Sequence, residues 1–250
     1  MLLAVLRRTL VVVPRRCGRD SGRGWWQKYQ REGPAGFTRY NAPKSFDFDA
    51  ADGATKARRS RCFFELSVDG EGAGVVEFEL ADEILPVTCA NFRLLCSGEA
   101  PSGFDYGGSK FARRVVKHVA IMGGNVETPG GSHSAFASRR YFPDEGFLIP
   151  HSAPGILTMA NSGRDTNGSQ FYVTLASAPH MDGRCVAFGR VTSGFDTILK
   201  IHDTVFTQRG KPVQTVLVAN CGVLPSKSPS SSNAALSPRT SPPQPHALSP

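Results

Sequence analysis

The alternation of apolar and polar residues predicts short strands through the middle of the chain. In residues 74–80, Val76, Phe78 and Leu80 alternate with Glu77 and Glu79, which is the period of a strand that buries one face. Similar runs lie between glycine, proline and turn-prone residues, and we expect each to contain a strand: 62–70, 109–124, 154–163, 169–176, 185–191 and 215–224. The chain therefore has seven or eight short strands.

Two segments break this pattern and predict helices. Leu85, Cys89, Phe92 and Cys96 recur at helical spacing, Pro86 lies in the first turn, and a glycine follows at position 98. Residues 193–203 predict a second, short helix. Many short strands with two helices indicate a mainly β domain, a closed or nearly closed barrel that the helices cap.

The basic charge belongs to the N-terminal part of the chain. Residues 1–60 hold 13 Lys and Arg against 5 Asp and Glu, whereas residues 61–225 hold 14 against 16. The positive charge is therefore not spread over a folded face, and nucleic acid is an unlikely partner of the domain.

Residues 1–19 are rich in arginine, contain no acid before Asp20, and carry short apolar runs. This composition is typical of a mitochondrial presequence. A secretory signal needs one longer apolar run, which Arg7 and Arg8 interrupt here, and a plain basic tail on a cytoplasmic protein is the other alternative.

Three further segments complete the domain plan. Residues 20–60 combine aromatic and basic residues without a clear period, which suits a loose linker, a docking segment for a partner complex, or a segment folded back on the domain. Residues 61–225 form the expected domain. Residues 226–250 include eight serines and six prolines with no aromatic residue, so we expect a disordered tail.

The cysteines and the hydropathy exclude several classes of protein. The six cysteines are scattered without a CxxC pair or zinc spacing, which argues against a disulfide scaffold and a zinc site: Cys17, Cys62, Cys89, Cys96, Cys185 and Cys221. No apolar run reaches the roughly 18–20 residues of a membrane span, so we expect no membrane interaction.

Several motifs resemble those of one family, the cyclophilins. The runs at 154–163 (PGILTMANSG) and 166–172 (TNGSQFY) are the most specific, with His151 before them and Asp182-Gly183 after them. Residues 91–93, 96–99, 186–191 and 221–222 complete the resemblance, which covers about 61–225. It implies a closed eight-stranded antiparallel barrel with two capping helices, and peptidyl-prolyl cis-trans isomerase activity on proline-containing polypeptides.

The implied reaction rotates the amide bond before proline, whose barrier is about 18–20 kcal/mol. It needs no nucleophile, metal or cofactor. A catalyst must hold the proline ring in an apolar pocket, grip the flanking backbone, and place a cation near the prolyl amide. Arginine suits the last role because it stays charged and has several fixed donors.

The family places this arginine two residues after a strand phenylalanine. Counting forward from Phe111 gives Arg113, whereas counting back from Gly123-Gly124 gives Arg114. The chain therefore has one extra residue, which implies a bulge. The downstream spacing favours Arg114 as the catalytic residue, with Arg113 the alternative if the register is shifted.

The remaining site residues partly match the family. Ala160 and Asn161 match residues whose backbone grips substrate, Gln170 matches a supporting polar contact, and Tyr172 replaces a pocket phenylalanine. The other positions depart from the family pattern: Val119, Ala120, Met122, His180, Met181 and Cys185. The change to Val119-Ala120 makes the pocket shallower, and Met122 replaces the glutamine that positions the arginine.

These departures leave two hypotheses open. The first is a prolyl isomerase of reduced activity that assists folding or assembly. The second is a catalytically weak or inactive scaffold subunit of a mitochondrial complex. In either case we expect weak binding of the inhibitor cyclosporin, because His180 stands where the family has a tryptophan that donates to it.

Overall fold

A computed structural model of the chain describes residues 46–112, 114–116, 118–126, 131–205, 207–208 and 211–225. The expected presequence (1–19), most of the segment 20–60 and the tail 226–250 lie outside these residues. So does Arg113, which leaves the expected bulge untested.

The alternating segments form one antiparallel sheet of eight strands in the order β10-β1-β2-β7-β5-β6-β4-β3. Their bounds are β1 Arg61–Val68, β2 Glu71–Leu80, β3 Arg114–Val116, β4 Ala120–Gly123, β5 Ile156–Met159, β6 Phe171–Thr174, β7 Ala187–Ser193 and β10 Val216–Leu224. Two short strands, β8 (Thr207–Gln208) and β9 (Lys211–Pro212), pair separately.

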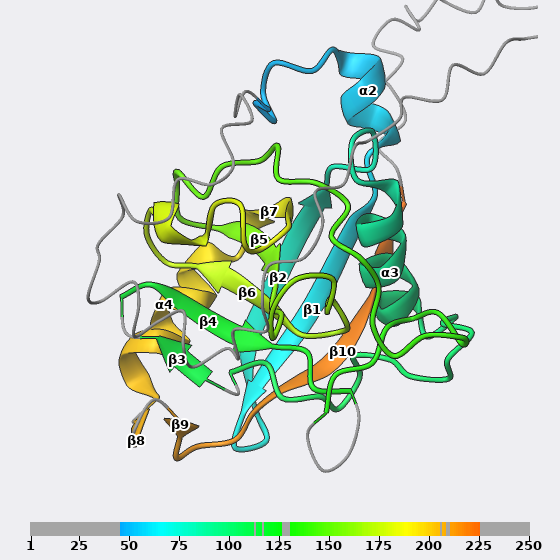
Figure 1. Cartoon of the computed structure of the whole chain (residues 1–250). Helices are drawn as coiled ribbons and strands as arrows, with labels where there is room; N and C mark the ends of the chain where they lie inside the picture. The colour runs from blue at the N-terminus through cyan, green and yellow to red at the C-terminus, as the bar shows by residue number, and fades with distance from the viewer. Residues whose placement is uncertain are drawn as a thin grey trace, which may run out of the picture.

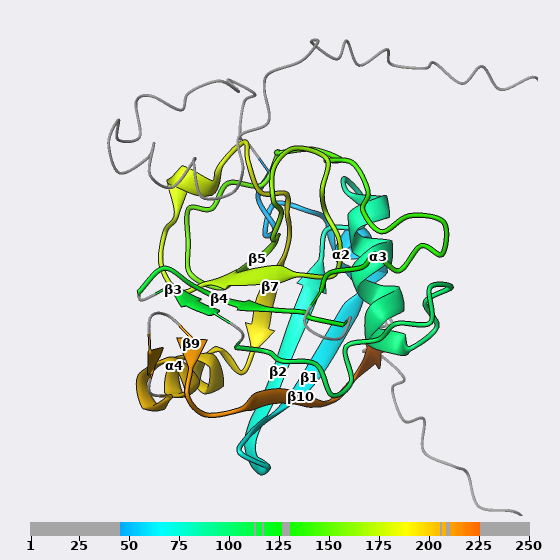
Figure 2. The same ribbon diagram turned by 60° about the horizontal axis from the view of Figure 1, so that its bottom comes forward.

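The sheet curls, and a short stretch of chain joins its two sides (Figure 2). Lys110 bridges both to Asn125, which follows β4, and to Leu217 in β10. The Phe111 N–H donates to the Val216 carbonyl, and the Gly124 N–H donates to the Lys110 carbonyl. These few bonds link the two sides of the curled sheet, and the predicted mainly β fold of eight antiparallel strands is confirmed.

The two predicted helices lie at opposite sides of the barrel (Figure 1). Helix α3 (Pro86–Ser97) begins with Pro86 and ends at Gly98, whose φ of 72° is left-handed and favours glycine. It buries Cys89, Phe92 and Cys96, as the spacing predicts. Helix α4 (Phe195–Thr204) buries Ile198 and Ile201.

Aromatic side chains fill the barrel. Phe64 lies at the centre, with ring centroids 5.0 Å from Phe78, 5.7 Å from Phe92 and 5.8 Å from Phe171. All four rings are fully buried, and burial of this apolar surface is the main source of stability. The alternation read from residues 74–80 is also confirmed, because Val76, Phe78 and Leu80 are buried.

Residues 46–60, which we call the N-terminal strap, pack against the barrel. The strap contains a third helix, α2 (Gly53–Arg58), that the sequence analysis did not predict. Phe48 is buried, and Arg59 is only 2% exposed. The described part of the segment 20–60 is thus in contact with the barrel through Phe46, Phe48 and Arg59.

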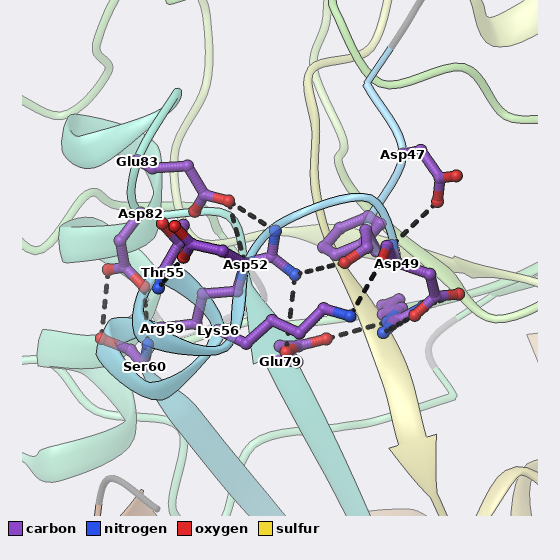
Figure 3. A network of polar contacts seen from close by, with 12 residues as sticks. Asp47, Asp49, Asp52, Thr55, Lys56, Arg59, Ser60, Glu79, Asp82 and Glu83 are labelled. Atoms are coloured by element: carbon purple, nitrogen blue, oxygen red, sulfur yellow. Dashed lines mark hydrogen bonds and ion pairs between the residues drawn. The ribbon is translucent and has the colours of Figure 1, made fainter. Parts of the chain in front are cut away.

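Charged groups attach the strap at both ends (Figure 3). Near the C-terminal end, Arg59 pairs with Glu83 at 2.6 Å, and its Nη1 donates to the Phe48 carbonyl at 2.9 Å. Near the N-terminal end, Asp49 accepts from Arg190 of β7 at 2.8 Å. Arg190 also pairs with Glu79 at 2.9 Å and lies over the Phe48 ring.

Candidate functional site

Three neighbouring strands bring three candidate positions into register in one row. The Cα partner of Arg114 in β3 is Met122 in β4, and the partner of Met122 is Tyr172 in β6. Residues opposite each other in an antiparallel pair share a face. Ile121 and Val173 alternate with this row and lie in the core, so Met122 and Tyr172 are on the outer face.

Beside this row lies a small apolar cluster, separate from the core. Its buried members are Ala178, Met181 and Cys185, and Val119 and Tyr172 pack against them. Val119 lies in the turn between β3 and β4, whereas Met181 is in the short 3-10 helix η2 (Pro179–Met181). Elements distant in the chain thus meet in a small apolar cluster, whose partly exposed members are Val119 and Tyr172.

Two other candidates border this cluster without joining it. Ala120 in β4 is 2% exposed and pairs with Thr174. His180 immediately precedes Met181 in η2 and is partly buried.

His151 anchors the loop that carries η2. Its backbone N–H and its Nδ1 both contact Asp182 Oδ1, at 2.9 and 2.8 Å, and its Nε2 lies 3.0 Å from Thr158 Oγ1 in β5. The Ala178 N–H donates to the His151 carbonyl at 2.7 Å. With His151 1% exposed, these bonds fix η2 against the sheet and so fix Met181 within the small apolar cluster.

Polar candidates line a pocket of about 180 Å³. Ala160, Asn161 and Gln170 all contribute to it. The remaining lining residues are Gly131, Ser132, Arg140, Tyr141, Ser162 and Thr166. We refer to this cavity as the polar pocket.

Hydrogen bonds hold the edge of the polar pocket in an extended form. The Ala160 N–H donates to the Gln170 carbonyl at 2.9 Å, and Asn161 Nδ2 donates to the Arg184 carbonyl at 2.7 Å. The Gln170 side chain donates to Asn125 Oδ1. The backbone at 160–161 is therefore a fixed edge beside the small apolar cluster.

Sequence reasoning missed three contributors to this arrangement. Asn125 holds Gln170, and its position directly after Gly123-Gly124 was a usable signal. The Ser132 hydroxyl accepts from the Ser169 N–H at 2.9 Å, and Ala178 completes the small apolar cluster. Nothing in the spacing of Ser132 or Ala178 links them to the site.

Glycine is required where the site approaches the barrel wall. Gly124 has a φ of +85°, and a Cβ there would collide with the Ser169 carbonyl oxygen. Any other residue would push Ser169 and the adjoining Gln170 away from β4.

Burial sets the ionisation of two site residues. It lowers the pKa of His180, and the nearby His151 and Arg184 add to this effect. It raises the pKa of the Cys185 thiol to about 12, with a further contribution from Asp144, so Cys185 stays protonated and apolar in character. Burial thus favours the neutral form of both residues.

Two further findings concern the described residues. No three His, Cys, Asp or Glu side chains gather there in a way that would hold a metal ion. No helix among them is both long and apolar enough to cross a membrane. The described residues thus combine a small apolar cluster, a hydrogen-bonded backbone edge and a polar pocket.

Comparisons with known proteins agree with this geometry. A family model described as cyclophilin type peptidyl-prolyl cis-trans isomerase/CLD matches residues 63–223. The NK-tumor recognition protein of Homo sapiens is 41% identical over 176 residues, which are 68% of this chain and 12% of the human protein. The Mus musculus protein of the same name is 41% identical over 175 residues, with the same shares. The chain thus spans about an eighth of the length of these relatives.

Proposed function

Because the chain belongs to the cyclophilin-type peptidyl-prolyl cis-trans isomerase family, we propose that it binds proline-containing polypeptides and isomerises their X–Pro bonds. The observation that carries the proposal is the meeting of the small apolar cluster with the fixed edge at Ala160 and Asn161. The cluster suits a proline ring, and the edge suits the backbone on either side of it.

In this proposal the proline ring lies against Val119, Tyr172 and Met181. Apolar contact contributes about 0.8 kcal/mol for each CH₂ group removed from water. The ring is thereby held while the preceding residue, gripped along 160–161, rotates about the amide bond.

The cation comes from position 114. The pairing of Arg114 with Met122, and of Met122 with Tyr172, puts this position in the same row as the pocket wall. A guanidinium near the prolyl nitrogen stabilises the charge that localises there when amide resonance is lost. This step needs neither a covalent intermediate nor a cofactor.

We expect the rate to be modest for the family. Met122 has no polar atom that binds a guanidinium strongly, so nothing opposite position 114 in β4 fixes the cation, and a misplacement of about 1 Å can cost about 100-fold in rate. The same observation favours a second candidate function, a scaffold that binds proline-containing segments of a partner without turnover.

The two functions differ in the exchange rate of a bound peptide. The full chain is mixed with a short Ala-Pro peptide, and cis/trans exchange is followed by NMR magnetisation transfer. Isomerase activity predicts exchange that accelerates in proportion to protein concentration and slows in a Tyr172→Ala variant. Peptide binding without acceleration would support the scaffold instead, and absence of both would overturn the proposal.

A further inference from the structure

We propose that His118 and His202 form a binding site for a divalent transition-metal ion, of which Cu²⁺ and Zn²⁺ are the best suited. The site joins the turn between β3 and β4 to helix α4. It lies outside the peptide site, and the proposal does not rest on the proposed function.

The two imidazole rings already lie at the spacing that one shared ion needs. Their centroids are 5.4 Å apart with 56° between the ring planes. Two imidazoles bound to one ion through metal–nitrogen bonds of about 2.0–2.1 Å, at a tetrahedral angle, have centroids about 5 Å apart. The separation of the two centroids therefore agrees with a shared ion to within about half an ångström.

A carboxylate prepares His202 as a ligand. His202 Nδ1 lies 2.8 Å from Asp203 Oδ1, which fixes the hydrogen on Nδ1 and leaves the lone pair on Nε2. That Nε2 faces His118, because it accepts the His118 backbone N–H at 3.3 Å. A carboxylate behind a ligating imidazole orients the ring and raises its basicity, as in many metal sites.

The ion replaces only a weak interaction. The hydrogen bond from the His118 N–H to His202 Nε2 is longer than the usual length of about 2.9–3.0 Å. The His118 side chain is exposed, so an ion can approach from solvent, and water completes its coordination.

The turn that carries His118 has a defined backbone conformation. His118 has a left-handed φ of 60°, which is uncommon for a residue other than glycine. The Val119 N–H donates to the Val116 carbonyl in β3 at 2.9 Å, and the N–H of Leu175, directly after β6, donates to the Val119 carbonyl at 2.7 Å, so these bonds hold the turn in place. Because Val119 also packs in the small apolar cluster, an ion here braces one wall of that cluster.

Two imidazoles also determine which metals bind. Imidazole suits Cu²⁺ and Zn²⁺, and the order of affinities for nitrogen sites favours Cu²⁺ over the other divalent first-row metals. Mg²⁺ and Ca²⁺ prefer oxygen ligands, and Asp203 is already bonded to His202. We therefore expect no competition from these two ions.

The test titrates Cu²⁺ into the full chain and follows binding by calorimetry and by electron paramagnetic resonance. We expect one ion per chain with a spectrum of two imidazole nitrogens. His118→Gln and His202→Gln should each weaken binding at least tenfold, and Asp203→Asn by about tenfold, the usual effect of losing a carboxylate behind a ligand. His246→Gln, in the C-terminal tail, is the matched control and should leave binding unchanged.

Two outcomes would overturn the site. The first is Cu²⁺ affinity that His118→Gln leaves unchanged; because this side chain is exposed, that variant tests the site even if His202→Gln fails to fold. The second is a spectrum without imidazole nitrogens. Zn²⁺ gives an independent measurement, since binding to the folded state should raise the melting temperature of the parent and not that of His118→Gln.

Discussion

Arg59 and Glu83 form a two-donor ion pair, in which the Nε and Nη2 of the arginine donate to one carboxylate oxygen at 2.9 and 2.6 Å. Arg59 is 2% exposed and also contacts the Phe46 and Phe48 rings. The pair therefore links the N-terminal strap to the chain segment that follows β2.

Arg59→Met should destabilise the protein, because it leaves partly buried carboxylates without their cation. Removing one partner of a buried ion pair costs about 3 kcal/mol or more, measured as the free energy of unfolding in urea. The neighbouring Arg58 is exposed, and Arg58→Met should change the free energy by less than about 0.5 kcal/mol. If Arg59→Met lowered the free energy of unfolding as little as Arg58→Met does, the ion pair of the strap would not contribute to stability.

The strap also shows where sequence reasoning reaches its limit. Period-two alternation predicted the strands, because each strand buries one face whatever its partner is. The strap has no period, and its anchor Arg190 lies in β7, far along the chain. Contacts of this kind depend on tertiary packing and leave no local pattern.

The candidate site likewise contains some residues that the sequence marks and others that it does not. The spacing of the family motifs marked Ala160, Gln170 and Tyr172, and these residues lie around one face of the barrel. The contribution of Ala178 and the bracing of Gln170 by Asn125 come from loops whose course the sequence does not specify.

His180 should make stability depend on pH. Burial lowers its pKa below the usual 6.5, so the folded state binds a proton less readily than the unfolded state. The contribution of neutral His180 to the free energy of unfolding is complete above the pKa that His180 has in the unfolded state. This contribution is lost as the pH falls through the lower pKa that His180 has in the folded state. Between about pH 7 and about pH 5, the parent should therefore lose more stability than His180→Gln, as urea unfolding at several pH values measures. Parallel curves for the two proteins would contradict this.

Cyclosporin should bind weakly to the parent, since His180 and Val119 replace the indole donor and the deep pocket implied by the family. His180→Trp should raise the affinity at least tenfold, or by about 1.4 kcal/mol, in a calorimetric titration. A parent that already binds at nanomolar concentration would show that these two positions do not set the affinity.

Restoring the pocket should raise activity. In the variant Val119→Phe with Met122→Gln, the ring deepens the apolar contact and the amide oxygen accepts a hydrogen bond from a guanidinium at position 114. We expect kcat/KM to rise at least about threefold, a gain of about 0.7 kcal/mol in transition-state binding. Val87→Phe, at an exposed position of α3, is the control and should have no effect.

The most direct measurement compares kcat/KM for an Ala-Pro peptide between Arg114→Ala and Arg113→Ala in the full chain. The pairing of Arg114 with Met122 predicts that Arg114→Ala loses at least about tenfold, or ~1.4 kcal/mol of transition-state stabilisation. Arg113→Ala should change the value by less than about twofold, as a surface substitution does. The reverse order would place the extra residue after the catalytic position, and indifference of catalysis to both substitutions would contradict the account of a cation at the prolyl amide.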